Sequence, residues 1–148
     1  MRFMLKLWII LTLGTVLVGC IHFGSYKTEI KVAGGNTPTF GLSGSGKILK
    51  FTINGPRQRP GDGPEAYTVW EFRPIGNTDD LDVLDRLKTV QYGVVPTGYK
   101  QLYPENNLPP PSLVEGESYL LQIFTENAPW GQKAFELRGD NVFEVPIK

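Results

Sequence analysis

The sequence predicts an all-β fold, an antiparallel β-sandwich of about seven or eight strands. Short runs rich in β-branched and aromatic residues alternate between apolar and polar positions along the chain. Glycine and proline, with 17 and 12 copies in 148 residues, separate these runs at short intervals. Short strands with frequent turn signals are typical of sandwiches and barrels, and the sequence offers only one helix candidate, which excludes parallel βαβ units.

The clearest strand candidate is KILKFTIN, residues 47–54. Its residues alternate, so that Leu49, Phe51 and Ile53 are expected on one face and the polar residues on the other. The alternation predicts that these three apolar side chains point into the core.

The segment AYTVWEFR, residues 66–73, alternates in the same way. Trp70 and Phe72 fall on one face, where core residues would lie, so we interpret both as packing residues. The other strand candidates are TEIKVA (28–33), TVQYGVV (89–95), YKQLY (99–103), ESYLLQIFTE (117–126), KAFELR (133–138) and NVFEVPI (141–147).

One segment, residues 77–90, does not alternate. Its leucines at positions 81, 84 and 87 are three apart, and Thr78 or Asp79 supplies an N-cap. A short helix near 79–88 and an extended conformation are both compatible with this pattern.

We expect residues 28–148 to form one domain, an immunoglobulin-like or transthyretin-like sandwich. Two of its connections, 54–65 and 104–117, are long and rich in proline. Long loops on a β scaffold are common places for binding residues, and they also serve simply to connect sheets. The fold class alone assigns no function, because sandwiches support many unrelated activities.

The N-terminal segment has the features of an export signal. Arg2 and Lys6 give a positive start, and a largely apolar run of about a dozen residues follows over 7–18. A membrane-spanning helix needs about 20 residues. We therefore expect residues 1–19 to be a signal peptide that is removed.

The end of this segment, Leu17-Val18-Gly19-Cys20, resembles the lipobox of bacterial lipoproteins. The resemblance implies cleavage between Gly19 and Cys20 and acyl chains on Cys20, which is the only cysteine in the chain. Residues 20–27 would then form a lipidated N-terminus and short tether. Ile21 stands where aspartate would retain a Gram-negative lipoprotein at the inner membrane, so the resemblance implies an outer-membrane lipoprotein facing the periplasm.

The charge of the processed chain bears on its partners. Removing 19 of 148 residues leaves 129, with 13 basic and 15 acidic side chains because Arg2 and Lys6 are lost. Proteins that bind nucleic acid usually carry a basic stripe, so we expect no nucleic-acid partner. Attachment to a membrane is expected through the acyl chains alone.

Two short motifs imitate functional sites. Residues 41–47, GLSGSGK, match the start of a phosphate-binding loop, but position 48 is isoleucine and a strand candidate follows in place of a helix. We therefore expect a turn and no nucleotide. Arg138-Gly139-Asp140 lies between two strand candidates, so we expect a hairpin turn there.

The sequence predicts no enzyme, metal or cofactor. The acids at 79, 80, 82 and 85 lack the glycine and glutamate positions of a calcium-binding loop. His22, the only histidine, stands two residues from Cys20, so neither a zinc site nor a catalytic triad can be assembled around it.

The remaining aromatic residues are the candidates for a binding surface. Trp130 lies in the turn-like segment ENAPWGQ between two strand candidates. It either folds over the core or presents a surface for a sugar or a protein. Tyr92, Tyr99 and Tyr103 could line the same edge.

Two functions follow as expectations. The first is a non-catalytic interaction or assembly module of the cell envelope that holds a protein partner at the membrane. The alternative is a binding module for envelope glycan or a small molecule. An exposed apolar patch would favour the first, and a concave pocket around Trp130 would favour the second.

Overall fold

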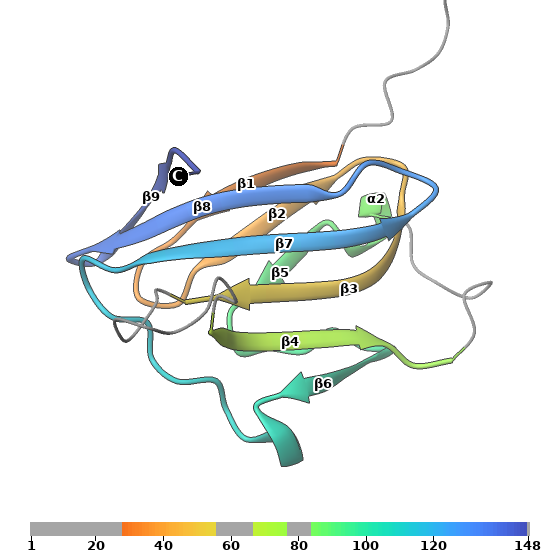
Figure 1. Cartoon of the computed structure of the whole chain (residues 1–148), viewed down its shortest axis with the longest axis horizontal. Coiled ribbons are helices and arrows are strands. Elements are labelled where there is room, and N and C mark those ends of the chain that lie inside the picture. The colour runs from red at the N-terminus through yellow and green to blue at the C-terminus, as the bar shows by residue number, and fades with distance from the viewer. Residues whose placement is uncertain (1–27, 56–66, 77–83, 148) are drawn as a thin grey trace, which may run out of the picture.

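The structure, a computed structural model, describes residues 28–55, 67–76 and 84–147, and these form a sandwich of two antiparallel sheets (Figure 1). The small sheet has the order β1-β2-β5 and the large sheet the order β6-β4-β3-β7-β8-β9. The predicted all-β sandwich is confirmed. The strands are β1 (Glu29–Ala33), β2 (Thr39–Ser43), β3 (Lys47–Asn54), β4 (Thr68–Pro74), β5 (Thr89–Gln91), β6 (Tyr99–Tyr103), β7 (Ser118–Glu126), β8 (Gly131–Arg138) and β9 (Asn141–Val145).

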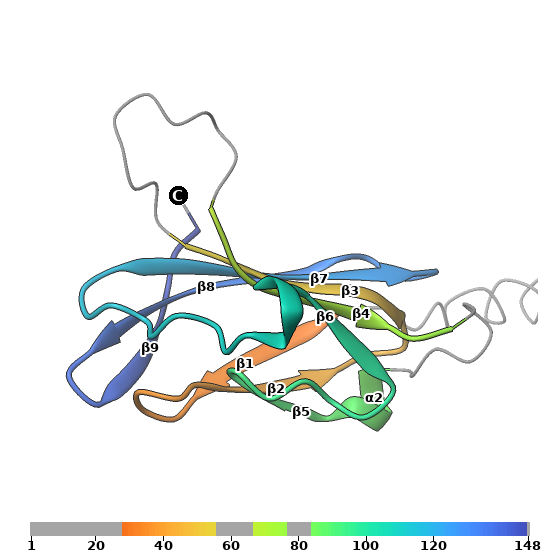
Figure 2. The ribbon, with the colours of Figure 1, turned by 90° about the horizontal axis from the view of Figure 1, so that it is seen from below.

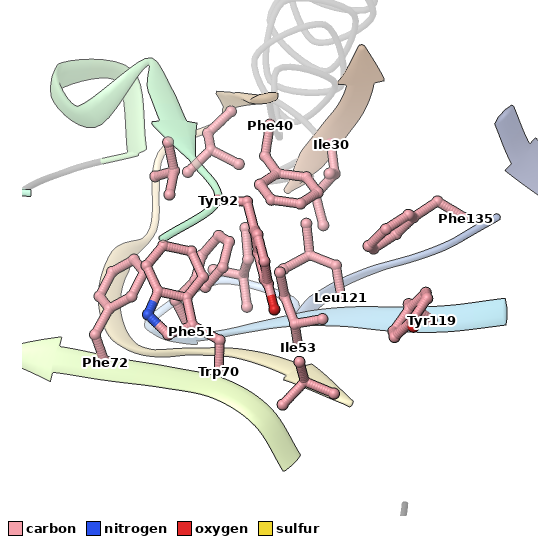
Figure 3. Packing of buried hydrophobic residues seen from close by; sticks show 14 of the residues in the cluster. Ile30, Phe40, Phe51, Ile53, Trp70, Phe72, Tyr92, Tyr119, Leu121 and Phe135 are labelled. Atoms are coloured by element: carbon pink, nitrogen blue, oxygen red, sulfur yellow. The ribbon is translucent and has the colours of Figure 1, made fainter. Parts of the chain in front are cut away.

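The core lies between the two sheets, which Figure 2 shows as an upper and a lower layer. Aromatic rings fill it (Figure 3): Phe51 stacks on Phe72 at 4.6 Å between ring centroids, and Trp70 meets Phe51 edge-on at 5.6 Å. All three side chains are fully buried. The predicted core positions of Phe51, Ile53, Trp70 and Phe72 are therefore confirmed.

The predicted core position of Leu49 is wrong. The pairing of β3 with β7 shifts between Ile48 and Lys50, which indicates a β-bulge. The extra residue breaks the simple alternation, so Ile48 is fully buried and Leu49 is 38% exposed.

Strand β2 lies in the middle of the small sheet, although the glycines and proline around it argue against a central strand. Pro38 directly precedes the strand, so its missing N–H removes no hydrogen bond from β2. Phe40 is fully buried and pairs with Val90 of β5. This strand was not among the predicted ones, because the proline and glycines around it are typical of turns.

Helical structure in the described ranges is confined to two short elements. Helix α2 (Leu84–Leu87) is a single turn that buries Leu84 and leads directly into β5. The rest of the predicted helix near 79–88 falls largely outside the described residues. The second element is the 3₁₀ segment η2 (Glu105–Asn107).

The proline-rich connection 104–117 closes one side of the sandwich. Gln101 on β6 donates hydrogen bonds to the carbonyl oxygens of Pro104 and Leu108, both at 2.7 Å. The Tyr92 hydroxyl, which follows β5, donates to Pro111 at 2.7 Å. Because these residues come from both sheets, the connection serves as a structural clasp between them.

The opposite side is closed by contacts between β9 and the small sheet. The Val142 N–H donates to the Gly34 carbonyl at 3.1 Å, and the Val32 N–H donates to the Glu144 carboxylate at 3.2 Å. These bonds satisfy groups on strand edges that would otherwise invite another chain.

The predicted signal peptide 1–19, the tether 20–27 and the lipidation site Cys20 lie outside the described residues, as does most of the loop 54–65.

Candidate functional site

The four aromatic residues expected on a common edge are separated by the fold. Tyr92 and Tyr99 are 7% and 6% exposed and belong to the core, where Tyr92 packs edge-on against Trp70 and Tyr99 against Phe72. They are packing residues and cannot line a binding surface, which corrects the expectation for both.

Tyr103 and Trp130 remain at the surface. The Tyr103 hydroxyl is 3.2 Å from the Tyr67 hydroxyl at the β4–β6 edge, and this hydrogen bond raises the pKa of Tyr103 above its usual value. Trp130 lies directly before β8, and 67% of its surface is exposed. Tyr103 ends β6 and Trp130 precedes β8, and these strands lie on either side of the sheet centre, so the two residues do not form one edge.

Trp130 is part of a cluster on the outer face of the large sheet, the face turned away from the small sheet. Its ring meets Phe124 edge-on at 4.7 Å, and the Lys50 ammonium lies 4.6 Å from the centre of the Phe124 ring. Lys50 and Phe124 are paired across β3 and β7, and the bulge places Leu49 on the solvent side beside them. We call these four residues the Trp130 corner.

Polar side chains occupy the middle of the outer face. Thr52 donates to Glu71 at 3.3 Å, and the Asn54 amide donates to Gln122 at 2.9 Å. Lys50 lies 3.6 Å from the same Glu71 carboxylate. Because these groups satisfy one another, the centre of the face is a bonded network and offers few open donors to a ligand.

A groove runs along the outer face on the far side of this network. The chain after β9 turns over β7 and β8, and an open space of about 600 Å³ lies beneath it. Leu120 and Ala134 line the floor, and Val145, Pro146 and Ile147 line the wall. We call this feature the C-terminal groove.

The rim of the C-terminal groove carries an ion pair. Arg138 donates two hydrogen bonds to the Glu136 carboxylate, at 3.0 and 3.1 Å. The paired carboxylate raises the pKa of Arg138, so the guanidinium stays charged. Arg138 also lies 5.4 Å from the centre of the Phe143 ring, which is 45% exposed. An apolar floor with a charged rim is the usual composition of a protein–protein contact.

The two imitated motifs have the predicted local structure. Residues 41–43 end β2 and Lys47 begins β3, so GLSGSGK is a turn between two strands. Gly44 has a φ of 137°, a conformation that glycine adopts readily. Arg138 pairs with Asn141 across the β8–β9 hairpin, and Gly139 at a φ of 57° makes its turn.

The described ranges hold neither a metal cluster nor a membrane-spanning helix. They contain no group of three or more histidine, cysteine, aspartate or glutamate side chains placed to hold a metal ion. Nor do these ranges include a helix with the length and apolar character needed to cross a membrane.

Comparison with known proteins gives no relative: no family model, curated protein or solved structure matches the chain. The candidate site therefore consists of the two surface features above. The sequence predicted an exposed candidate at Trp130 but not the C-terminal groove, because the groove forms only where residues 145–147 lie over the outer face of β7 and β8, which no local pattern marks. The one available signal was the apolar stretch VPI just after the last strand.

Proposed function

We propose that this chain is a lipid-anchored, non-catalytic interaction module that holds a protein partner in the C-terminal groove. The observation that carries the proposal is the groove itself, with its apolar floor and charged rim beside the polar centre of the outer face.

The composition of the groove favours a protein partner over a glycan. Leu120, Val145 and Ile147 offer aliphatic surface, whereas glycan sites rely on aromatic rings and open polar groups. Ile147 is 49% exposed, so a partner would remove apolar surface from water. The Glu136–Arg138 pair would orient the partner through charge and add little net affinity.

The membrane attachment in this proposal rests on the lipobox-like residues 17–20. Each buried CH₂ group contributes about 0.8 kcal/mol, so the two or three acyl chains expected on Cys20 would anchor the domain stably. A Cys20→Ser variant would stay uncleaved or leave the detergent phase on phase separation. A wild-type chain that partitions as a soluble protein with its signal intact would refute the anchor.

The partner is tested by site-specific photo-crosslinking of the full-length protein in its native envelope. A photoreactive amino acid replaces Ile147 in the groove, and Ile75, which is 60% exposed outside the groove, serves as the matched control position. We expect one stoichiometric protein adduct from position 147 and none from position 75.

Two substitutions on β8 test whether the partner occupies the groove or the neighbouring part of the same face. Ala134→Arg fills the groove floor, and Gln132→Arg places the same side chain two residues away on the same face but outside the groove. Loss of the adduct in the first variant and retention in the second supports the proposal. Equal adducts in both variants, or retention of polysaccharide fragments without a protein, would contradict it.

A further inference from the structure

We propose that the Trp130 corner docks on the phospholipid surface to which the chain is anchored, with the Trp130 ring at the headgroup level. This inference rests on the proposed acylation of Cys20 and adds a second membrane contact to it.

The chain enters the domain next to Trp130. The Thr28 hydroxyl donates a hydrogen bond of 2.7 Å to the carbonyl oxygen of Pro129. Thr28 is the residue before β1, and Pro129 is the residue before Trp130. The polypeptide that leads back to Cys20 therefore starts beside the β7–β8 turn that carries Trp130.

The polypeptide between Cys20 and the domain is short. Eight residues, 20–27, separate the expected acylated end from Thr28, and they span at most about 28 Å when fully extended. Trp130 lies where this short tether joins the domain and is therefore held near the lipid headgroups, whereas the opposite end of the sandwich reaches them only when the tether is close to full extension.

The side chains of the Trp130 corner are of the kinds found at membrane interfaces. Tryptophan concentrates at membrane interfaces, because its large ring is apolar and its N–H is polar. Trp130 is 67% exposed, and Leu49, next to Lys50 on β3, is a further exposed apolar side chain, at 38%. The partly exposed Lys50 ammonium, 3.6 Å from the Glu71 carboxylate, lies at the same place, and a lysine at an interface extends its charge toward phosphate groups while its stem contacts apolar surface.

The shape of the corner favours a broad surface over a small ligand. The depression beside Trp130, lined by Gln122, Phe124 and Gln132, encloses only about 100 Å³. Sites for small molecules usually enclose about 300–1,000 Å³. A lipid interface requires no cavity, because it adapts to a protruding side chain.

Tryptophan fluorescence gives a direct test in the full-length, processed protein. The chain has three tryptophans, and Trp8 is expected to leave with the signal, so only Trp70 and Trp130 report. Trp70 is fully buried and serves as an internal reference for folding. The protein is reconstituted into vesicles of phosphatidylethanolamine and phosphatidylglycerol that contain phosphatidylcholine brominated at the upper acyl-chain positions.

We expect the brominated lipid to quench the Trp130 emission, and we expect this quenching to be lost in Trp130→Phe. A second exposed tryptophan is the matched control: Leu108→Trp in the Trp130→Phe background places the ring at a side chain that is 58% exposed on the clasp segment. This control ring should be quenched by aqueous iodide and not by brominated lipid.

Intact mass and vesicle flotation separate the two proposals. An acylated protein that floats with the vesicles, but whose Trp130 is quenched by iodide and not by brominated lipid, overturns the inference and leaves the anchor standing. Protection of Trp130 from both quenchers by added envelope glycan or a protein overturns it in favour of that occupant. A chain without acyl groups that does not float refutes the anchor, and the docking inference with it.

Discussion

The buried hydroxyl of Tyr92 permits a prediction whose size and pH dependence both follow from the structure. The hydroxyl donates a 2.7 Å hydrogen bond to the Pro111 carbonyl and so fastens the clasp segment 104–117 to the small sheet. Tyr92→Phe removes this bond and leaves the ring packing intact. Near pH 7 the variant should lose about 1 kcal/mol of unfolding free energy, the usual net contribution of one hydrogen bond.

At alkaline pH the difference between the two proteins should vanish and, at pH 11, reverse by about 0.4 kcal/mol. Burial of the side chain, helped by the nearby Tyr119 and Tyr67 hydroxyls, raises the pKa of Tyr92 above its ordinary value of 10.0. Below pH 10 the tyrosine is protonated in both states, so its contribution is fully present. Above pH 10 the unfolded chain releases the proton while the folded chain keeps it, and stability falls by about 1.4 kcal/mol per pH unit.

The measurement is urea unfolding at pH 7 and pH 11, followed by the fluorescence of Trp70, whose ring is 5.5 Å from the Tyr92 ring. The other tyrosines titrate in both proteins, so their effects cancel in the difference. At pH 11 the wild type should have lost about 1.4 kcal/mol that the phenylalanine variant keeps. An equal gap between the two proteins at both pH values would refute the argument.

Three further predictions test the core, the hairpin that carries Trp130 and the β9 edge. Phe51→Ala should destabilise the protein by about 3–5 kcal/mol in urea unfolding, because the ring is fully buried in the aromatic core. Gly131→Ala would place a methyl group against the Thr28 side chain and should lower the unfolding free energy by about 1–3 kcal/mol. Adding Thr28→Ser to this variant removes the contacting methyl group and keeps the hydroxyl, so it should restore most of the lost free energy. The hydrogen bond from Lys133 is the main reason why the pKa of Glu144 is lowered in the folded protein. The carboxylate therefore contributes to the unfolding free energy above its ordinary pKa of 4.5, and this contribution is lost as the pH falls through the folded-state pKa. Glu144→Gln should reduce the fall in unfolding free energy between pH 5 and pH 3 by less than about 1 kcal/mol, because both side chains are partly exposed.

The alternation of apolar and polar residues was sufficient to predict the sandwich and much of its core. Phe51, Trp70 and Phe72 stand on the core-facing side of two long strands, and a shift of one residue would turn every ring to the outer face of the sheet. Their burial is therefore encoded locally. The prediction for Leu49 failed because a bulge inserts one residue into the strand, and the pairing partner on β7 that defines this bulge lies about 75 residues away in sequence.

The candidate site was less predictable, because exposure depends on contacts between distant segments. Tyr92 and Tyr99 carry no local signal that separates a core tyrosine from a surface one; the clasp segment and the Phe72 ring bury them. Trp130 could be predicted to differ from Trp70, because proline and glycine flank it and place it in a turn. The groove had no comparable signal.

The two surface features lie apart along the same pair of strands, and their order relates them to the proposed anchor. Trp130 precedes β8, and the groove residues Ala134 and Arg138 follow it by four and eight positions, or about 13 and 26 Å at 3.3 Å per residue. Figure 1 shows the β7–β8 hairpin and the start of β1 at one end of the molecule and the β8–β9 hairpin at the other. If the Trp130 end rests on lipid, the groove lies farther along the strands from the bilayer, where a protein partner can approach without displacing the anchor. Docking and partner binding are therefore compatible, and Trp130→Phe should leave the Ile147 adduct unchanged while it abolishes lipid quenching.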